Sequence, residues 1–213
     1  MGTSKDQSEE KPQVGVGPWE GNWPVEDFYD SELLENGDRR NVVDKYRYWK
    51  HDAIVADLDS RRHEFHIAIE NWQHDLNIGT VVRTANAFMA KEVHIIGKKR
   101  WNRRGAMVTD KYQHIVHHQT VEDFLSWAKK AKVEVIGIDN FPDSVPLETY
   151  ELPLKCVLVF GQESIGLTDE VHKVCKDTLS IAQFGSTRSM NAASAAAIAM
   201  HAWIRQHVFN QQV

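Results

Sequence analysis

The feature that most constrains the fold is a regular alternation of short apolar runs with segments of helical spacing, which continues from about residue 63 to the carboxyl terminus. Short runs rich in β-branched residues predict strands at residues 65–70, 92–97, 133–138, 156–160 and 178–182. Apolar residues at helical spacing predict helices at 77–89, 121–131, 168–176 and 191–207. This alternation predicts an α/β domain whose mostly parallel sheet is covered by helices on both faces.

The residues before this alternation differ in composition. Residues 1–24 are polar, are interrupted by Pro and Gly, and show no periodicity, which is typical of a flexible arm. Residues 25–62 are weakly periodic and predict a partly helical N-terminal extension to the domain at 63–213. Trp19 and Trp23 are unusual in such an arm, and we expect them to dock onto folded parts of the chain.

Composition limits the class of protein. With 213 residues, of which 42% are hydrophobic, the chain can bury a substantial core. It has no apolar run near the roughly 20 residues of a membrane span and no signal peptide at its start, so we expect a soluble, cytoplasmic protein. Cys156 and Cys175 are too few for a disulfide framework or a four-cysteine zinc site, which indicates plain buried thiols.

The distribution of charge is more informative than the net charge of −5. Residues 1–40 hold ten of the 30 acids and four of the 25 bases, which leaves 20 acids and 21 bases for the rest of the chain. The body is therefore nearly neutral, and an anionic partner must be met by a local basic patch. Residues 98–104, KKRWNRR, supply five cations around Trp101 and fit phosphate contacts with a base or ribose stacked on the indole, although a solvated loop has the same composition.

Three polar loops flank predicted strands near their carboxyl ends, where open α/β sheets bind ligands. In the first, Asn77 is a good helix N-cap, Gly79 permits close approach, and Arg83 lies off the apolar stripe. The second, residues 161–167, places two glycines around an acid after the most apolar strand. The third, residues 185–191, precedes an alanine-rich helix. Each has an ordinary structural explanation as a turn or a helix cap.

The three loops together resemble the three signature motifs of the SpoU/TrmH branch of the SPOUT methyltransferases. NIGTVVRTANAF, FGQESIGL and GSTRSMNAASAAA occur in the family's order, and the resemblance covers about residues 63–207. It implies a C-terminal deep trefoil knot that binds S-adenosylmethionine, a homodimer, and methyl transfer to a ribose 2′-hydroxyl of RNA. The short body and the RSMN sequence at 188–191 favour tRNA over rRNA.

Carried over by position, the resemblance implies roles for single residues. The catalytic set is Arg83, Asn77, Glu163, Ser189 and Asn191. The cofactor contacts fall at Ile138, Gly161, Ile181 and Met190. Arg83 either accepts the hydroxyl proton in a special environment or orients a phosphate and stabilises the developing alkoxide. We prefer the second role, because an arginine is too basic to serve readily as a proton acceptor.

The RNA contacts are expected at Lys98, Lys99, Arg100, Arg103 and Arg104. No metal is expected, because His114, His117 and His118 have no acid or thiol at a supporting spacing. An rRNA 2′-O-methyltransferase and a non-catalytic RNA-binding relative remain alternatives. A serine hydrolase built on Ser164 is a more distant one, since GQESIG is one residue longer than a nucleophile elbow.

Overall fold

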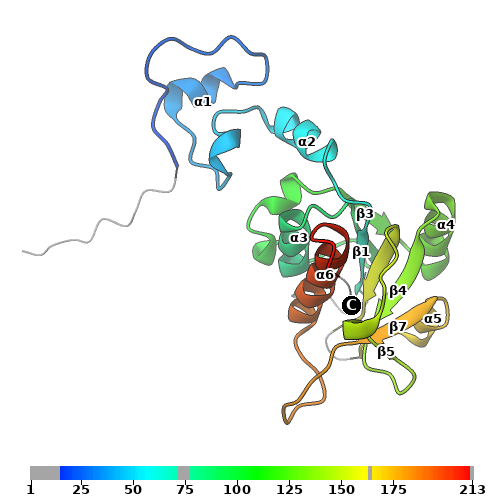
Figure 1. The fold of residues 1–213 in the computed structure, drawn as a ribbon. Helices are drawn as coiled ribbons and strands as arrows, with labels where there is room; N and C mark the ends of the chain where they lie inside the picture. The colour runs from blue at the N-terminus through cyan, green and yellow to red at the C-terminus, as the bar shows by residue number, and fades with distance from the viewer. Residues whose placement is uncertain (1–14, 72–76, 163–164, 212–213) are drawn as a thin grey trace, which may run out of the picture. The chain divides into compact units, whose positions relative to one another are not determined.

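The computed structural model describes residues 15–71, 77–162 and 165–211 (Figure 1). The chain divides into two compact units, residues 1–57 and 58–213, which are described separately. The sequence placed the corresponding boundary at 62/63. In the described part of the chain, no helix is both long and apolar enough to cross a lipid bilayer.

The larger unit contains one seven-stranded sheet of order β3-β2-β1-β6-β4-β7-β5, in which every pair of neighbours is parallel. Its strands are β1 (His66–Asn71), β2 (Val93–Gly97), β3 (Ile115–His118), β4 (Glu134–Ile138), β5 (Val145–Pro146), β6 (Cys156–Phe160) and β7 (Asp177–Ser180). The five predicted strands are confirmed. The two that were missed are edge strands: β3 is half polar, and β5 has only two residues.

The helices are α3 (Ile78–Ala87), α4 (Val121–Ala131), α5 (Asp169–His172) and α6 (Ala192–His207). All four were predicted, but α5 is shorter than the predicted 168–176. It ends early because Lys176 already donates its backbone N–H to Val135 of β4, which turns the chain into β7. Thr168 caps α5, accepting a hydrogen bond from the Val171 amide.

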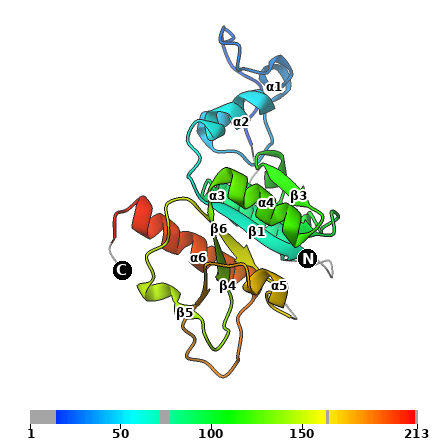
Figure 2. The same ribbon diagram turned by 90° about the vertical axis from the view of Figure 1, so that its right-hand side faces the viewer.

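Helices pack against the sheet (Figure 2), and alternate residues of each central strand contribute to two apolar layers. Ile67 and Ile69 of β1 belong to the layer formed with α3 and α6, whereas Ala68 belongs to the layer under α4 and α5. Burial on both faces explains why the strands read as continuous apolar runs. The predicted sheet with helices on both faces is confirmed.

The smaller unit holds α1 (Ser31–Asn36), a short 3-10 helix (Asp44–Tyr46) and the start of α2 (His51–Asp59). Residues 15–24, predicted as part of a flexible arm, are hydrogen-bonded here: Val16 pairs with Asp38, and the Trp19 amide donates to the Leu34 carbonyl. The Trp19 ring packs edge-on against Tyr29 and Tyr48, while Trp23 is half exposed. The aromatic ring cluster overrides the polar composition of this segment.

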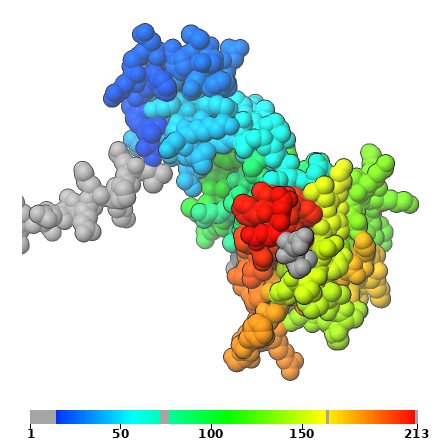
Figure 3. All heavy atoms as spheres, in the orientation of Figure 1, coloured from blue at the N-terminus to red at the C-terminus, as the bar shows by residue number. Residues whose placement is uncertain are grey.

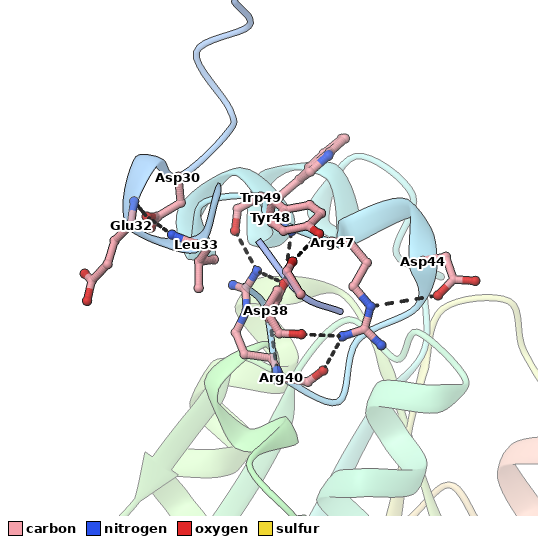
Figure 4. A network of polar contacts seen from close by, with 10 residues as sticks. Asp30, Glu32, Leu33, Asp38, Arg40, Asp44, Arg47, Tyr48 and Trp49 are labelled. Atoms are coloured by element: carbon pink, nitrogen blue, oxygen red, sulfur yellow. Dashed lines mark hydrogen bonds and ion pairs between the residues drawn. The ribbon is translucent and has the colours of Figure 1, made fainter. Parts of the chain in front are cut away.

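Asp38 is the polar centre of the smaller unit (Figure 4). Its fully buried carboxylate accepts hydrogen bonds from the Arg40 side chain at 2.7 and 2.9 Å and from the amides of Arg40 and Tyr48, both at 3.0 Å. Burial alone would raise the pKa of Asp38, but these bonds outweigh it and lower the pKa from 3.8 to about 2.

Asp38→Asn is expected to destabilise the smaller unit by about 2 kcal/mol at neutral pH, because the charged form is what the four donors stabilise. Since the folded pKa lies below the ordinary value, this contribution is complete above pH 3.8 and is lost as the pH falls towards 2. Amide hydrogen exchange of residues 16–49 measures the effect. Asp27→Asn, at an exposed carboxylate, is the control and should leave exchange unchanged.

Candidate functional site

A cavity of about 270 Å³ opens at the carboxyl ends of β4, β6 and β7. All four residues predicted to contact the cofactor line it, although they come from three different segments of the chain. The described lining residues are Ile138, Asp139, Asn140, Phe160, Gly161, Gln162, Ile165, Gly166, Leu179, Ile181, Gln183, Ser189, Met190, Ala192 and Ala195. Of the predicted catalytic residues, Ser189 lines the same cavity.

The two ends of the loop after β6 lie very close together. Gln162 and Gly166 exchange backbone hydrogen bonds of 3.1 and 2.8 Å. A Cβ on Gly161 would lie 1.9 Å from the Gly166 carbonyl carbon, so no side chain fits there. Gly166 has a φ of +71°, which an L-residue rarely adopts. The two glycines thus allow the loop to fold tightly beside the cavity.

Asp139 and Asn140 are site residues that the sequence analysis missed. The Asp139 carboxylate accepts the Leu167 amide at 2.7 Å, and the Asn140 side chain donates to the Arg188 carbonyl at 2.6 Å. They therefore tie the loop after β4 to the loops after β6 and β7. Their signal in the sequence was position, since two polar residues directly follow a predicted strand.

The chemistry of the cavity fits a ligand with an apolar, flat part and a polar part. Ile138, Phe160 and Leu179 supply apolar contact, while strand-end backbone groups, Asn140 and Gln183 supply hydrogen-bonding groups. Asp139 is the one carboxylate among the described lining residues, and none of these is a His or Cys. This donor set suits an adenosine-type cofactor and offers no metal site.

Asn77 and Asn191, from the first and third loops, are hydrogen-bonded to each other at 2.9 Å. Asn191 also caps α6 through the amides of Ala193 and Ser194. The prediction that Asn77 caps α3 was wrong: its backbone is already helical, and its side-chain oxygen accepts from Asn191 instead. Glu163 and Ser164 lie outside the described residues.

Arg83 does not line the cavity. It is exposed on α3, one turn after Gly79, and within the described ranges its guanidinium makes no hydrogen bond or ion pair. Gly79 is packed directly on the backbone of the 102–106 segment, since a Cβ there would lie 2.8 Å from the Asn102 oxygen. The amino-terminal turn of α3 therefore contacts the basic segment, which is residues 98–104.

The five cations of the basic segment are all exposed. Asn71, at the end of β1, holds their loop by donating to the carbonyls of Lys98 at 2.6 Å and Arg100 at 2.9 Å. Stacking of a base or ribose on Trp101 stays a prediction, and the Trp101 side chain is partly buried. Its ring packs against the core, and the Arg103 guanidinium lies 5.7 Å over it. Asn71 directly follows the predicted strand at 65–70, and its role was missed because it acts on the backbone of a loop distant in the sequence.

The three histidines that follow make structural contacts. His114 is hydrogen-bonded to Asp59 at 2.8 Å, His117 to the Gly97 carbonyl at 2.7 Å, and His118 to His94 at 2.9 Å.

The two cysteines, Cys156 and Cys175, are unpaired thiols, and burial raises the pKa of each to about 12. They stay protonated and are poor nucleophiles.

The segment between β7 and α6, orange in Figure 3, projects from the larger unit. It carries Phe184, whose side chain is almost fully exposed, together with Ser189 and Met190 at its cavity end. A model of the SpoU rRNA methylase family matches residues 64–201, which include all three loops and this segment. The chain belongs to the SpoU rRNA methylase family. The resemblance inferred from the three motifs is confirmed.

The chain is similar, at low sequence identity, to RNA 2′-O-methyltransferases from other organisms. It is 21% identical over 160 residues to the tRNA (guanosine(18)-2′-O)-methyltransferase of Escherichia coli K12, covering 74% of this chain and 70% of that protein. It is 25% identical over 142 residues to the 23S rRNA (uridine(2479)-2′-O)-methyltransferase of Streptomyces viridochromogenes, covering 62% of this chain and 49% of that protein.

Solved structures of SpoU proteins share the fold. The A. aeolicus TrmH/SpoU tRNA modifying enzyme superimposes with a TM-score of 0.66 at 20% identity, over 75% of this chain and 83% of that one. The AdoMet-bound rRNA methyltransferase from Sinorhizobium meliloti gives a TM-score of 0.62 at 26% identity, over 70% of this chain and 60% of that one.

Proposed function

We propose that the protein transfers a methyl group from S-adenosylmethionine to a ribose 2′-hydroxyl of tRNA. The observation that carries this proposal is the convergence of Ile138, Gly161, Ile181 and Met190 on one cavity. Family membership supplies the enzyme class, and the relatives named above are tRNA and rRNA 2′-O-methyltransferases. The AdoMet-bound relative supports the choice of cofactor.

When bound, S-adenosylmethionine would supply an electrophilic sulfonium methyl group. Ile138, Ile181 and Met190 are proposed to pack against its adenine, and the backbone at Gly161 to hydrogen-bond its polar edge. The tight turn at Gly161 and Gly166 keeps side chains out of that space. Asp139 and Asn140 act as positioning residues, because they fix the three loops around the cavity.

Arg83 is proposed to act on the RNA and not on the cofactor. A 2′-hydroxyl becomes nucleophilic as it loses its proton, and negative charge develops on its oxygen. An exposed guanidinium near the basic segment can hold the neighbouring phosphate and stabilise that charge. Ser189 lines the cavity, and Asn191, two residues further along the same loop, is hydrogen-bonded to Asn77 of the first loop. Glu163 keeps its proposed role in this set.

The exposed cations at 98–104 are proposed to bind RNA phosphates. Their loop packs on the start of α3, which brings the RNA backbone to the helix that carries Arg83. Arg103 forms an ion pair with Asp110 at 3.6 Å, and 75% of the Arg103 side chain remains exposed. Lys98, Lys99, Arg100 and Arg104 extend the same surface.

Replacing Lys99, Arg100, Arg103 and Arg104 with glutamine is expected to weaken RNA binding and to flatten its salt dependence. The slope of log affinity against log salt should fall by about 0.7 to 0.9 for each phosphate that the variant no longer neutralises. Binding titrations at several salt concentrations measure this. Lys129→Gln with Lys130→Gln on α4, on the opposite face of the sheet, is the matched control. An unchanged slope in the loop variant would mean that the loop is merely solvated.

A homodimer is proposed through α6. A groove of about 360 Å³ runs beside this helix and is lined by Ala197, Ile198, His201 and Ala202 among others. Ile198 remains 43% exposed, and small alanines let another helix approach closely. A second copy of the chain is the proposed occupant, as in the isologous contacts of two-fold dimers.

The predicted deep trefoil knot is proposed for the loops around the cavity. In the sheet order, β6 lies between β1 and β4 and β7 lies beyond β4, which is compatible with such a knot. The near contact of Gly161 with Gly166 and the bond from Asn140 to Arg188 support it too.

A cytoplasmic location is proposed because tRNA is modified there.

The choice of tRNA rests on several relatives with that activity, and the Streptomyces relative makes 23S rRNA the second candidate. RNA from a strain lacking the protein is digested and its nucleosides are compared with the parent by mass spectrometry. Loss of one 2′-O-methyl mark from the tRNA fraction is expected. Loss of an rRNA mark with every tRNA mark intact would overturn the tRNA assignment.

A further inference from the structure

A buried cluster of two histidines and a glutamate lies away from the cavity, at the amino ends of β1 and β2. His66 and His94 are 5% and 0% exposed, while the Glu92 side chain is 31% exposed. Ile67 pairs with Val93 in the sheet, so His66 stands beside Glu92. Glu92 and His94 are two residues apart and share a face. The cavity lies at the opposite, carboxyl ends of the strands.

The three ligand atoms form a nearly equilateral triangle. His66 Nδ1 is 3.2 Å from His94 Nε2 and 3.3 Å from Glu92 Oε2, and the last two atoms are 3.5 Å apart. In a tetrahedral zinc site with bonds of about 2.0 to 2.1 Å, two ligand atoms are about 3.3 to 3.4 Å apart. The triangle therefore has the dimensions of one face of a zinc tetrahedron without any rearrangement.

We propose that His66, Glu92 and His94 bind a zinc ion, with water as the fourth ligand on the partly exposed side of Glu92. Two imidazoles and a carboxylate are a ligand set that Zn²⁺ accepts. The ion links β1 to the residues that begin β2. Because the site is remote from the cofactor cavity, the zinc stabilises the fold and takes no part in methyl transfer.

The surroundings of the triangle are those of a metal site. The other ring nitrogen of His94 is hydrogen-bonded to His118 Nε2 at 2.9 Å, and such an outer partner fixes the orientation of a ligand histidine. Trp127 packs on His94 with ring centroids 3.7 Å apart and edge-on to His66 at 5.0 Å.

The proposed site departs from the sequence-based expectation of no metal, which considered only the histidines at 114, 117 and 118. The ligands are 26 and two residues apart in the chain, and only the parallel pairing of β1 with β2 brings them together. His118 does contribute, but as the partner of a ligand.

Zinc binding to the full-length protein, purified without a polyhistidine tag and stripped with a chelator, tests the proposal. Calorimetric titration with Zn²⁺ should give one site per chain with micromolar or tighter affinity, and the ion should raise the melting temperature. Glu92→Gln preserves size and one oxygen, so the variant should fold, yet it should weaken Zn²⁺ binding at least tenfold. Co²⁺ in the same site should give the intense visible absorption of tetrahedral coordination.

His114→Gln is the matched control, because His114 pairs with Asp59 outside the triangle. It should bind Zn²⁺ as the parent does. His118→Gln should weaken binding about tenfold to a hundredfold, the usual cost of losing an outer partner. Zinc binding that is absent in the parent, or equal in the parent and Glu92→Gln, would overturn the proposal.

Discussion

Arg83→Ala is expected to lower turnover on RNA by about 100-fold or more, the usual cost of removing one preorganised donor from a developing negative charge. The fold should be unaffected, because the side chain is exposed and contributes nothing to the core. S-adenosylmethionine affinity should stay at the parental level, since the proposed cofactor contacts lie at Ile138, Gly161, Ile181 and Met190. Single-turnover kinetics and calorimetry separate the two effects.

Arg83→Lys sharpens this test. An ammonium keeps the charge but loses the planar fork that positions a phosphate, so little activity should return. Arg39→Ala, at an exposed arginine of the smaller unit, is the control for general loss of positive charge and should retain activity. Parental turnover in Arg83→Ala would remove this residue from the catalytic set and would leave the first motif, at 77–86, with a non-catalytic role.

Gly161→Ala is expected to weaken S-adenosylmethionine binding by about 100-fold or more. The added methyl group would lie 1.9 Å from Gly166 C and 2.1 Å from Leu167 N, and both are backbone atoms. The loop must move to admit it, which displaces one wall of the cavity at a cost of about 1 to 3 kcal/mol or more. Calorimetry measures the affinity, and circular dichroism reports whether the fold is retained.

Gly185→Ala is the matched control for that substitution. Gly185 lies in the segment between β7 and α6, and a Cβ there would meet nothing within 4 Å. Cofactor affinity should stay within about twofold of the parent. Parental affinity in Gly161→Ala would place the cofactor elsewhere.

The fold was predictable where the sequence pattern is strong. The central strands β1, β2, β4 and β6 are buried on both faces, so their apolar runs are clear in the sequence. The edge strand β3 was missed because two of its four residues are histidines, and only its pairing with β2 shows that it is a strand. The residues at 15–24 were misjudged, since their order comes from contacts with Asp38, Tyr29 and Tyr48 that no local pattern encodes.

The site was predictable to the extent that its residues lie in ordered motifs. The four cofactor positions came from resemblance, and the fold brings all four to one cavity. The sequence analysis missed Asp139, Asn140 and Asn71, because each acts through backbone groups of a loop distant in the sequence. It also missed the His66–Glu92–His94 triangle, because strand pairing and not sequence spacing assembles these residues.

Transfer of a labelled methyl group in vitro tests the central claim most directly. The purified protein is incubated with labelled S-adenosylmethionine and unmodified bulk tRNA, and the RNA is digested to nucleosides. The label is expected on a ribose 2′-oxygen, and it should be nearly absent with Gly161→Ala or Arg83→Ala. Label on a base, or no label in tRNA or rRNA from a strain lacking the protein, would contradict the account.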